Sequence, residues 1–147
     1  MNEASTDTHS VVVERELSHP PEKVWRALTQ PHLIEEWLAK MDFKPVRGHR
    51  FSVKLDPQPN RTFVFDCEVT TVEPNRVLSY TWCSSDDESG NGLRTAVTWT
   101  LTPTPTGTRL RMEQSGFAPD QPLYHLGAKL GWPKFLTSLD EALTRIA

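Results

Sequence analysis

The pattern of hydrophobic and polar residues divides the chain into a strand, two short helical segments, several strands and a long terminal helix. Residues 11–17 are β-branched and partly alternating, which predicts a strand that ends at the Ser-His-Pro-Pro sequence of residues 18–21. Helical spacing follows over residues 21–29, with prolines at its start. Pro31 then opens a second amphipathic segment, so we expect a short helix over residues 32–38.

From residue 51 onward, apolar residues recur at every second position. A period of two is typical of half-buried antiparallel strands. We expect strands over residues 51–55, 63–70, 78–83, 95–101 and 109–114. A two-residue loop within residues 73–76 would pair Cys67 with Trp82 and Val69 with Tyr80, so that the two cysteines of the chain face opposite sides of the sheet.

The last part of the chain returns to helical spacing. Pro133 would remove one amide donor from this helix, so we expect a kink or a restart near Gly131. The order of the elements predicts an α+β fold, in which a curved antiparallel sheet of about six strands wraps around a long C-terminal helix. The apolar stripe of that helix comprises Ala128, Trp132, Phe135, Leu136, Leu139, Leu143 and Ile146.

Length and charge limit the possible organisation and partners. The 147 residues predict a single domain over residues 11–147, preceded by a disordered polar tail at residues 1–10. The formal net charge of −3 argues against a broad phosphate-binding surface, so we expect no nucleic-acid partner. Cys67 and Cys83 form neither a zinc-binding pattern nor a disulfide framework, and we expect both to be reduced.

Several functional classes lack their usual sequence signals. The first ten residues show no basic segment followed by an apolar run, and no stretch approaches the roughly 20 apolar residues of a membrane helix. We therefore expect a cytoplasmic protein with no membrane partner. Walker, GxGxxG, HExxH and GxSxG motifs and a Cys/His metal quartet are all absent from the sequence, so we expect no cofactor and no metal.

Two short polar sequences could suggest other roles. Asp86-Asp87-Glu88 groups three carboxylates but lacks the ligand spacing of a calcium loop, which predicts a solvated loop. Asn60-Arg61-Thr62 fits the glycosylation sequon, but it would stay unmodified in a cytoplasmic protein.

Four motifs, in this order and spacing, resemble the activator of heat-shock-protein-90 ATPase homologue-like family. This family is a branch of the START-like (SRPBCC) helix-grip superfamily, and the resemblance covers roughly residues 11 to 146. Two positions depart from it: the family often has Gly at position 67 and His at position 114, where this chain has Cys67 and Gln114. The motifs are PEKVWRALT (21–29) with Trp37, EVTTVEPNRVLSYTW (68–82), TRL (108–110) with QSGF (114–117), and GWPKFLTSL (131–139).

The resemblance implies a helix-grip fold with a cavity between the sheet and the C-terminal helix. Members of the superfamily use this cavity for lipids, polyketides or other hydrophobic small molecules, a few are enzymes, and bacterial single-domain members mostly have no assigned reaction. The inward residues here are rich in aromatic groups with a few polar ones, as in ligand pockets, although a collapsed core is the alternative. The candidate ligand-binding residues are Phe63, Phe65, Cys67, Tyr80, Trp82, Val97, Trp99, Met112, Gln114, His125, Ala128 and Trp132.

Three functions therefore remain open. The first is the binding of a hydrophobic or aromatic small molecule, with Tyr80 or Gln114 setting its orientation. The second is a protein-binding module for a chaperone, which the family's name implies. The third is a cyclase or hydrolase with His125 or Tyr80 as the acid–base group, although no carboxylate is placed to orient His125. Cys67 is a poor nucleophile candidate because Asp66 and Glu68 would raise its pKa. The protein could be a monomer or a homodimer.

Overall fold

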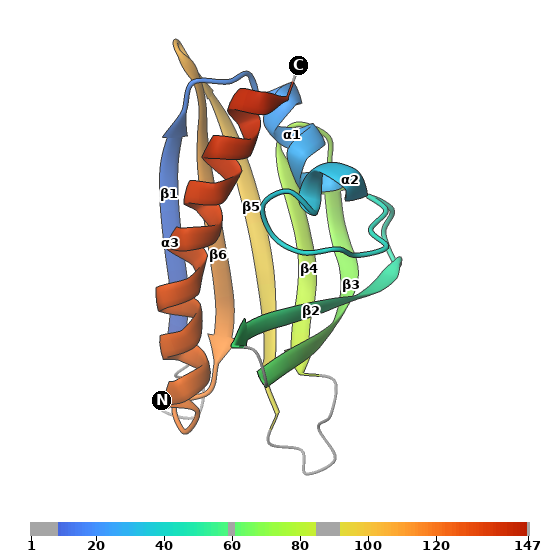
Figure 1. Ribbon diagram of the computed structural model, residues 1–147, viewed down its shortest axis with the longest axis vertical. Coiled ribbons are helices and arrows are strands. Elements are labelled where there is room, and N and C mark those ends of the chain that lie inside the picture. The colour runs from blue at the N-terminus through green and yellow to red at the C-terminus, as the bar shows by residue number, and fades with distance from the viewer. Residues whose placement is uncertain (1–8, 59–60, 85–91, 147) are drawn as a thin grey trace, which may run out of the picture.

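The computed structural model describes residues 9–58, 61–84 and 92–146 and shows one antiparallel sheet with a long helix across it (Figure 1). The strand order is β1-β6-β5-β4-β3-β2, which agrees with the predicted α+β architecture. The elements are β1 (His9–Leu17), α1 (Pro21–Thr29), α2 (Pro31–Ile34), β2 (Arg50–Gln58), β3 (Arg61–Glu73), β4 (Val77–Ser84), β5 (Arg94–Thr104), β6 (Gly107–Phe117) and α3 (Pro122–Arg145).

Some sequence predictions concern residues outside the described ranges, and the start of the first strand differs from its prediction. Residues 1–8 of the expected tail, the acidic sequence 86–88 and Asn60 of the sequon all lie outside the described residues. Strand β1 begins at His9, two residues earlier than expected, and pairs with β6 along its length.

The expected second helix is shorter than its amphipathic pattern suggested. Only Pro31–Ile34 are helical, and residues 35–38 continue as turns, in which the Trp37 amide donates to the Ile34 carbonyl. The Trp37 indole also donates to the backbone oxygen of Ala27 at 2.8 Å in the buried interior. This hydrogen bond holds the segment against α1, so that tertiary packing rather than helical spacing decides its conformation.

The turn between β3 and β4 differs from the expected two-residue loop. Glu73 pairs with Val77, so the loop has three residues, and Asn75 adopts a left-handed backbone with φ of 65°. Further along, the register shifts between Val69 and Thr71, which restores the predicted pairing of Val69 with Tyr80. A bulge in β3 thus compensates for the longer turn.

Helix α3 is continuous through Pro133, so the expected restart near Gly131 does not occur. The helix packs against β1, β6 and α1, and in Figure 1 it runs along β1 and β6 at one side of the sheet. Leu136, Leu139 and Leu143 in its C-terminal half are fully buried, whereas Leu123, Leu126 and Leu130 in its N-terminal half are exposed. The two halves of the helix therefore meet different surroundings.

Candidate functional site

A cavity of about 950 Å³ lies between the sheet and the N-terminal half of α3. This volume is at the upper end of the range of about 300–1,000 Å³ that is usual for ligand pockets. Its wall comprises Leu38, Ala39, Lys40, Lys54, Leu55, Phe63, Phe65, Trp82, Leu93, Gln114, Phe117, Leu123, Tyr124, Gly127, Ala128, Gly131, Trp132, Lys134 and Phe135.

One face of α3 forms the helical side of the cavity. Tyr124, Ala128, Gly131 and Phe135 follow one another at spacings of three and four residues, which places them on one face. A Cβ atom at Gly127 would meet no atom within 4 Å, and one at Gly131 would meet only the Phe135 ring at 4.0 Å. The two glycines thus leave open space at the helix surface, although glycine within a helix costs about 1 kcal/mol relative to alanine.

A chain of buried hydrogen bonds crosses the inner end of the cavity. The Trp132 indole donates to Oε1 of Gln114 at 2.7 Å, and Nε2 of Gln114 donates to Oγ1 of Thr95 at 2.8 Å. The Thr95 hydroxyl donates in turn to the backbone oxygen of Trp82 at 2.7 Å. The chain ties α3 to β6, β5 and β4, and it fixes the side chain of Gln114 in the wall of the cavity.

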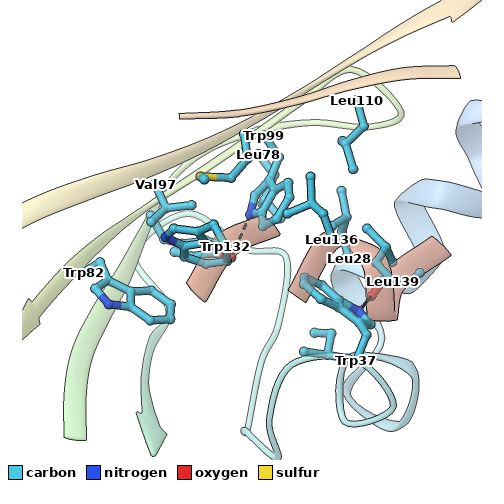
Figure 2. Packing of buried hydrophobic residues seen from close by; sticks show 14 of the residues in the cluster. Leu28, Trp37, Leu78, Trp82, Val97, Trp99, Leu110, Trp132, Leu136 and Leu139 are labelled. Atoms are coloured by element: carbon cyan, nitrogen blue, oxygen red, sulfur yellow. Dashed lines mark hydrogen bonds between the residues drawn. The ribbon is translucent and has the colours of Figure 1, made fainter. Parts of the chain in front are cut away.

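Four tryptophans pack edge to face from the cavity into the core (Figure 2). The ring centroids of Trp82 and Trp132 are 5.5 Å apart, those of Trp132 and Trp99 are 5.7 Å apart, and those of Trp99 and Trp37 are 5.6 Å apart. Trp82 and Trp132 line the cavity, whereas Trp99 is completely buried behind them. Trp132 therefore lies at the boundary between the cavity and the closed core.

Two buried groups in the cavity wall retain hydrogen-bonding capacity. The indole N–H of Trp82, whose side chain is 3% exposed, has no acceptor among the described residues. Gln114 uses one of its two amide N–H groups for Thr95, and the described part of the chain offers no partner for the other. Because buried donors are normally paired, both groups are suited to an acceptor on a bound molecule.

The structure divides the predicted site residues into three groups. Phe63, Phe65, Trp82, Gln114, Ala128 and Trp132 line the cavity together. Cys67, Tyr80, Val97, Trp99 and Met112 are buried in the core cluster outside the cavity wall. His125 also lies outside the wall, where its ring packs 5.2 Å from the Phe117 ring and 5.5 Å from the His9 ring.

Two of the groups considered for catalysis, the Tyr80 hydroxyl and the Cys67 thiol, have raised pKa values. Burial raises the pKa of the Tyr80 hydroxyl, which accepts a hydrogen bond from the Trp99 indole at 2.8 Å. Burial is also the main cause that raises the pKa of the Cys67 thiol, with smaller contributions from Cys83 and Asp66. A buried neutral thiol is a weak nucleophile. Tyr80 and Cys67 lie in the core cluster, whereas His125 packs against Phe117 and His9, so the fold does not bring His125 together with the two buried groups.

Part of the cavity wall was not predicted from the sequence: it comes from loops, from β2 and from the start of α3. Leu38 belongs to the amphipathic segment expected over residues 32–38, a period that does not indicate a cavity wall, and Ala39 and Lys40 follow it without any periodic pattern. Gly127 and Gly131 did carry a signal, because two glycines within a predicted helix interior call for a packing or functional reason.

The described residues contain no group of three or more His, Cys, Asp or Glu side chains that could hold a metal ion. Within the same residues, no helix combines the length and the apolar character that crossing a bilayer requires.

Residues 18–144 match the family model described as Activator of Hsp90 ATPase homolog 1-like protein. Among curated proteins, none matches the chain. The crystal structure of protein MLL2253 from Mesorhizobium loti is 60% identical, with a TM-score of 0.85, and the alignment covers 93% of this chain and 98% of that one.

Two more distant structures share the fold. DynU16, from the dynemicin biosynthetic locus, is 27% identical with a TM-score of 0.74; the alignment covers 92% of this chain and 47% of DynU16, so this chain spans about half of that protein. Protein NE0264 from Nitrosomonas europaea is 22% identical with a TM-score of 0.75, and the alignment covers 92% and 94% of the two chains.

Proposed function

The chain belongs to the family of Activator of Hsp90 ATPase homolog 1-like proteins, and from this premise we propose that it binds a hydrophobic or aromatic small molecule beneath α3. The observation that carries the proposal is the cavity of about 950 Å³, whose wall is mostly aliphatic and aromatic. The core beside it is closed, since Trp99, Leu110 and Met112 are all fully buried. The space beneath the N-terminal half of α3 is therefore a local feature and not loose packing of the whole interior.

Apolar burial supplies most of the binding free energy in this proposal. A ring system that removes about 200 Å² of apolar surface from water gains about 5 kcal/mol, at about 25 cal/mol per Å², before the costs of association. The Trp82 and Phe65 rings, with centroids 5.0 Å apart and planes tilted by 32°, offer an aromatic surface for such a ring. The free N–H groups of Trp82 and Gln114 then give the ligand a direction, because only an acceptor satisfies them.

Mass spectrometry of the freshly purified protein tests the proposal. A native spectrum is expected to show, besides the apoprotein, a species with extra mass that is absent from the denatured spectrum. Titration with the neutral fluorophore N-phenyl-1-naphthylamine covers the case in which the ligand dissociates during purification. A clean apoprotein mass together with no fluorescence enhancement of this probe would contradict the proposal.

A further inference from the structure

Three lysines surround the cavity, and each comes from a different segment. Lys40 follows α2, Lys54 lies on β2 and Lys134 lies on α3. All three are exposed, and none forms an ion pair with any residue that the structure describes. Among the described residues of this cavity wall, none is an Asp or a Glu.

This positive charge is local, because the whole chain carries a formal net charge of −3. The arginines at the other described sites are mostly balanced: Arg26, Arg50, Arg76 and Arg109, for example, each form an ion pair with a glutamate. Unbalanced charges of one sign around a low-dielectric cleft raise the local concentration of ions of the opposite sign. The cavity opening therefore favours an anion over a neutral or cationic molecule.

The buried polar groups of the wall have the same preference. The free indole N–H of Trp82 and the second amide N–H of Gln114 are both donors. An acceptor-rich molecule satisfies them, and a molecule that carries only donors does not. The lysines at the rim and the free donors at the inner end thus both favour a ligand that carries negative charge and hydrogen-bond acceptors.

We propose that the ligand is an amphipathic organic anion, whose apolar body fills the cavity and whose anionic group lies at the rim among Lys40, Lys54 and Lys134. This inference rests on the proposed function and adds the chemical class of the ligand to it. The apolar body is held by the aromatic wall, and the anionic group stays at the edge where it keeps part of its hydration.

Two related fluorophores separate the contribution of the charge from that of the apolar body. 1-Anilinonaphthalene-8-sulfonate carries a sulfonate, and N-phenyl-1-naphthylamine has the same aromatic body without it. The anionic probe is expected to bind at least about fivefold more tightly at low salt, which corresponds to about 1 kcal/mol from partly exposed ion pairs. Added salt is expected to reduce that advantage.

Variants in which lysines are replaced by glutamine test whether the preference for the anionic probe comes from the rim of the cavity. In the double variant Lys40→Gln/Lys134→Gln, the preference for the anionic over the neutral probe is expected to fall from about fivefold to less than about twofold. Lys44→Gln/Lys129→Gln is the matched control, since Lys44 and Lys129 are exposed lysines in the same regions but outside the cavity wall. This control is expected to keep the preference.

The outcomes distinguish the two proposals. Equal affinity for the two probes, or loss of the preference in the control as well as in the cavity variant, would overturn the assignment of an anionic ligand while leaving the binding function in place. Failure of both probes to bind the wild-type protein would contradict the binding function itself.

Discussion

Trp132 on α3 donates its indole N–H to Oε1 of Gln114 on β6 at 2.7 Å, and this contact marks the boundary between the core and the cavity. On one side of it, the Trp132 ring packs edge to face against fully buried Trp99. On the other side, it packs against Phe135 in the cavity wall. The hydrogen bond therefore holds α3 at a fixed place on the sheet while the helix leaves space farther toward its N-terminus.

Removing either partner of this hydrogen bond is expected to destabilise the fold, and the effects of the two removals are expected not to add up. Gln114→Leu leaves the buried Trp132 indole without its acceptor, which is expected to lower the free energy of unfolding by about 1–3 kcal/mol in urea titrations. Trp132→Phe removes the donor and part of the aromatic packing. The double variant is expected to cost less than the sum of the two single variants, because neither partner is then left unpaired. Strict additivity would show that the contact carries no stability of its own.

The two cysteines are expected to differ in their reactivity. Cys67 is 4% exposed and burial raises its pKa, whereas Cys83 is partly exposed. In the native protein, 5,5′-dithiobis(2-nitrobenzoate) is therefore expected to modify Cys83 first and Cys67 only as fast as the protein opens. Cys83→Ser is expected to abolish the fast phase. If a fast phase of thiol modification persists in Cys83→Ser, the Cys67 thiol is accessible in the native protein and the expectation is contradicted.

Stability is expected to fall at alkaline pH. Burial raises the pKa of Cys67 and of Tyr80 above their ordinary values of 9.0 and 10.0, so the unfolded chain releases these protons at a lower pH than the native protein does. Between these ordinary values and the raised native ones, the native state binds more protons, and the free energy of unfolding decreases as the pH rises. Below about pH 8 these two groups contribute no pH dependence.

Denaturant titrations of wild type and Cys67→Ala at pH 7.5, 9 and 10 check this dependence. The variant is expected to be less stable at pH 7.5 because it loses buried volume, but its stability is expected to fall less between pH 7.5 and 10. Val69→Ala, which removes buried volume from a side chain that does not titrate, serves as the control and is expected to keep the wild-type slope. An unchanged slope in Cys67→Ala would contradict the raised pKa of the buried thiol.

Much of the fold follows from the sequence because strand and helix periods are local properties. Alternation in the strands identified the inward face, and Val69 pairs with Tyr80 as predicted. The turn around Asn75 was predicted but its three-residue length was not, because a three-residue loop followed by a bulge gives nearly the same register as a two-residue loop. Alternation alone does not distinguish these two solutions.

The cavity was predictable only in part, for a geometric reason. Trp99 and Met112 lie on the same inward face as Trp82 and Gln114, so their alternation is the same, yet only the latter pair reaches the cavity. The difference depends on where α3 approaches the sheet, and that position is set by long-range contacts such as the one between Trp132 and Gln114. The wall contributed by residues 38–40 depends likewise on the Trp37–Ala27 hydrogen bond, which no sequence period encodes.

Binding of N-phenyl-1-naphthylamine to wild type and to Gly131→Leu tests the central claim most directly. The new side chain occupies the open space beside Gly131, which is expected to weaken the binding about tenfold through steric overlap with the probe. It also removes a helix glycine, so the melting temperature is expected to stay the same or to rise. Thr137→Leu, on an exposed part of α3 outside the cavity wall, is the matched control and is expected to bind as wild type does. Wild-type affinity in a folded Gly131→Leu protein would contradict the claim that ligands bind in the cavity beneath α3.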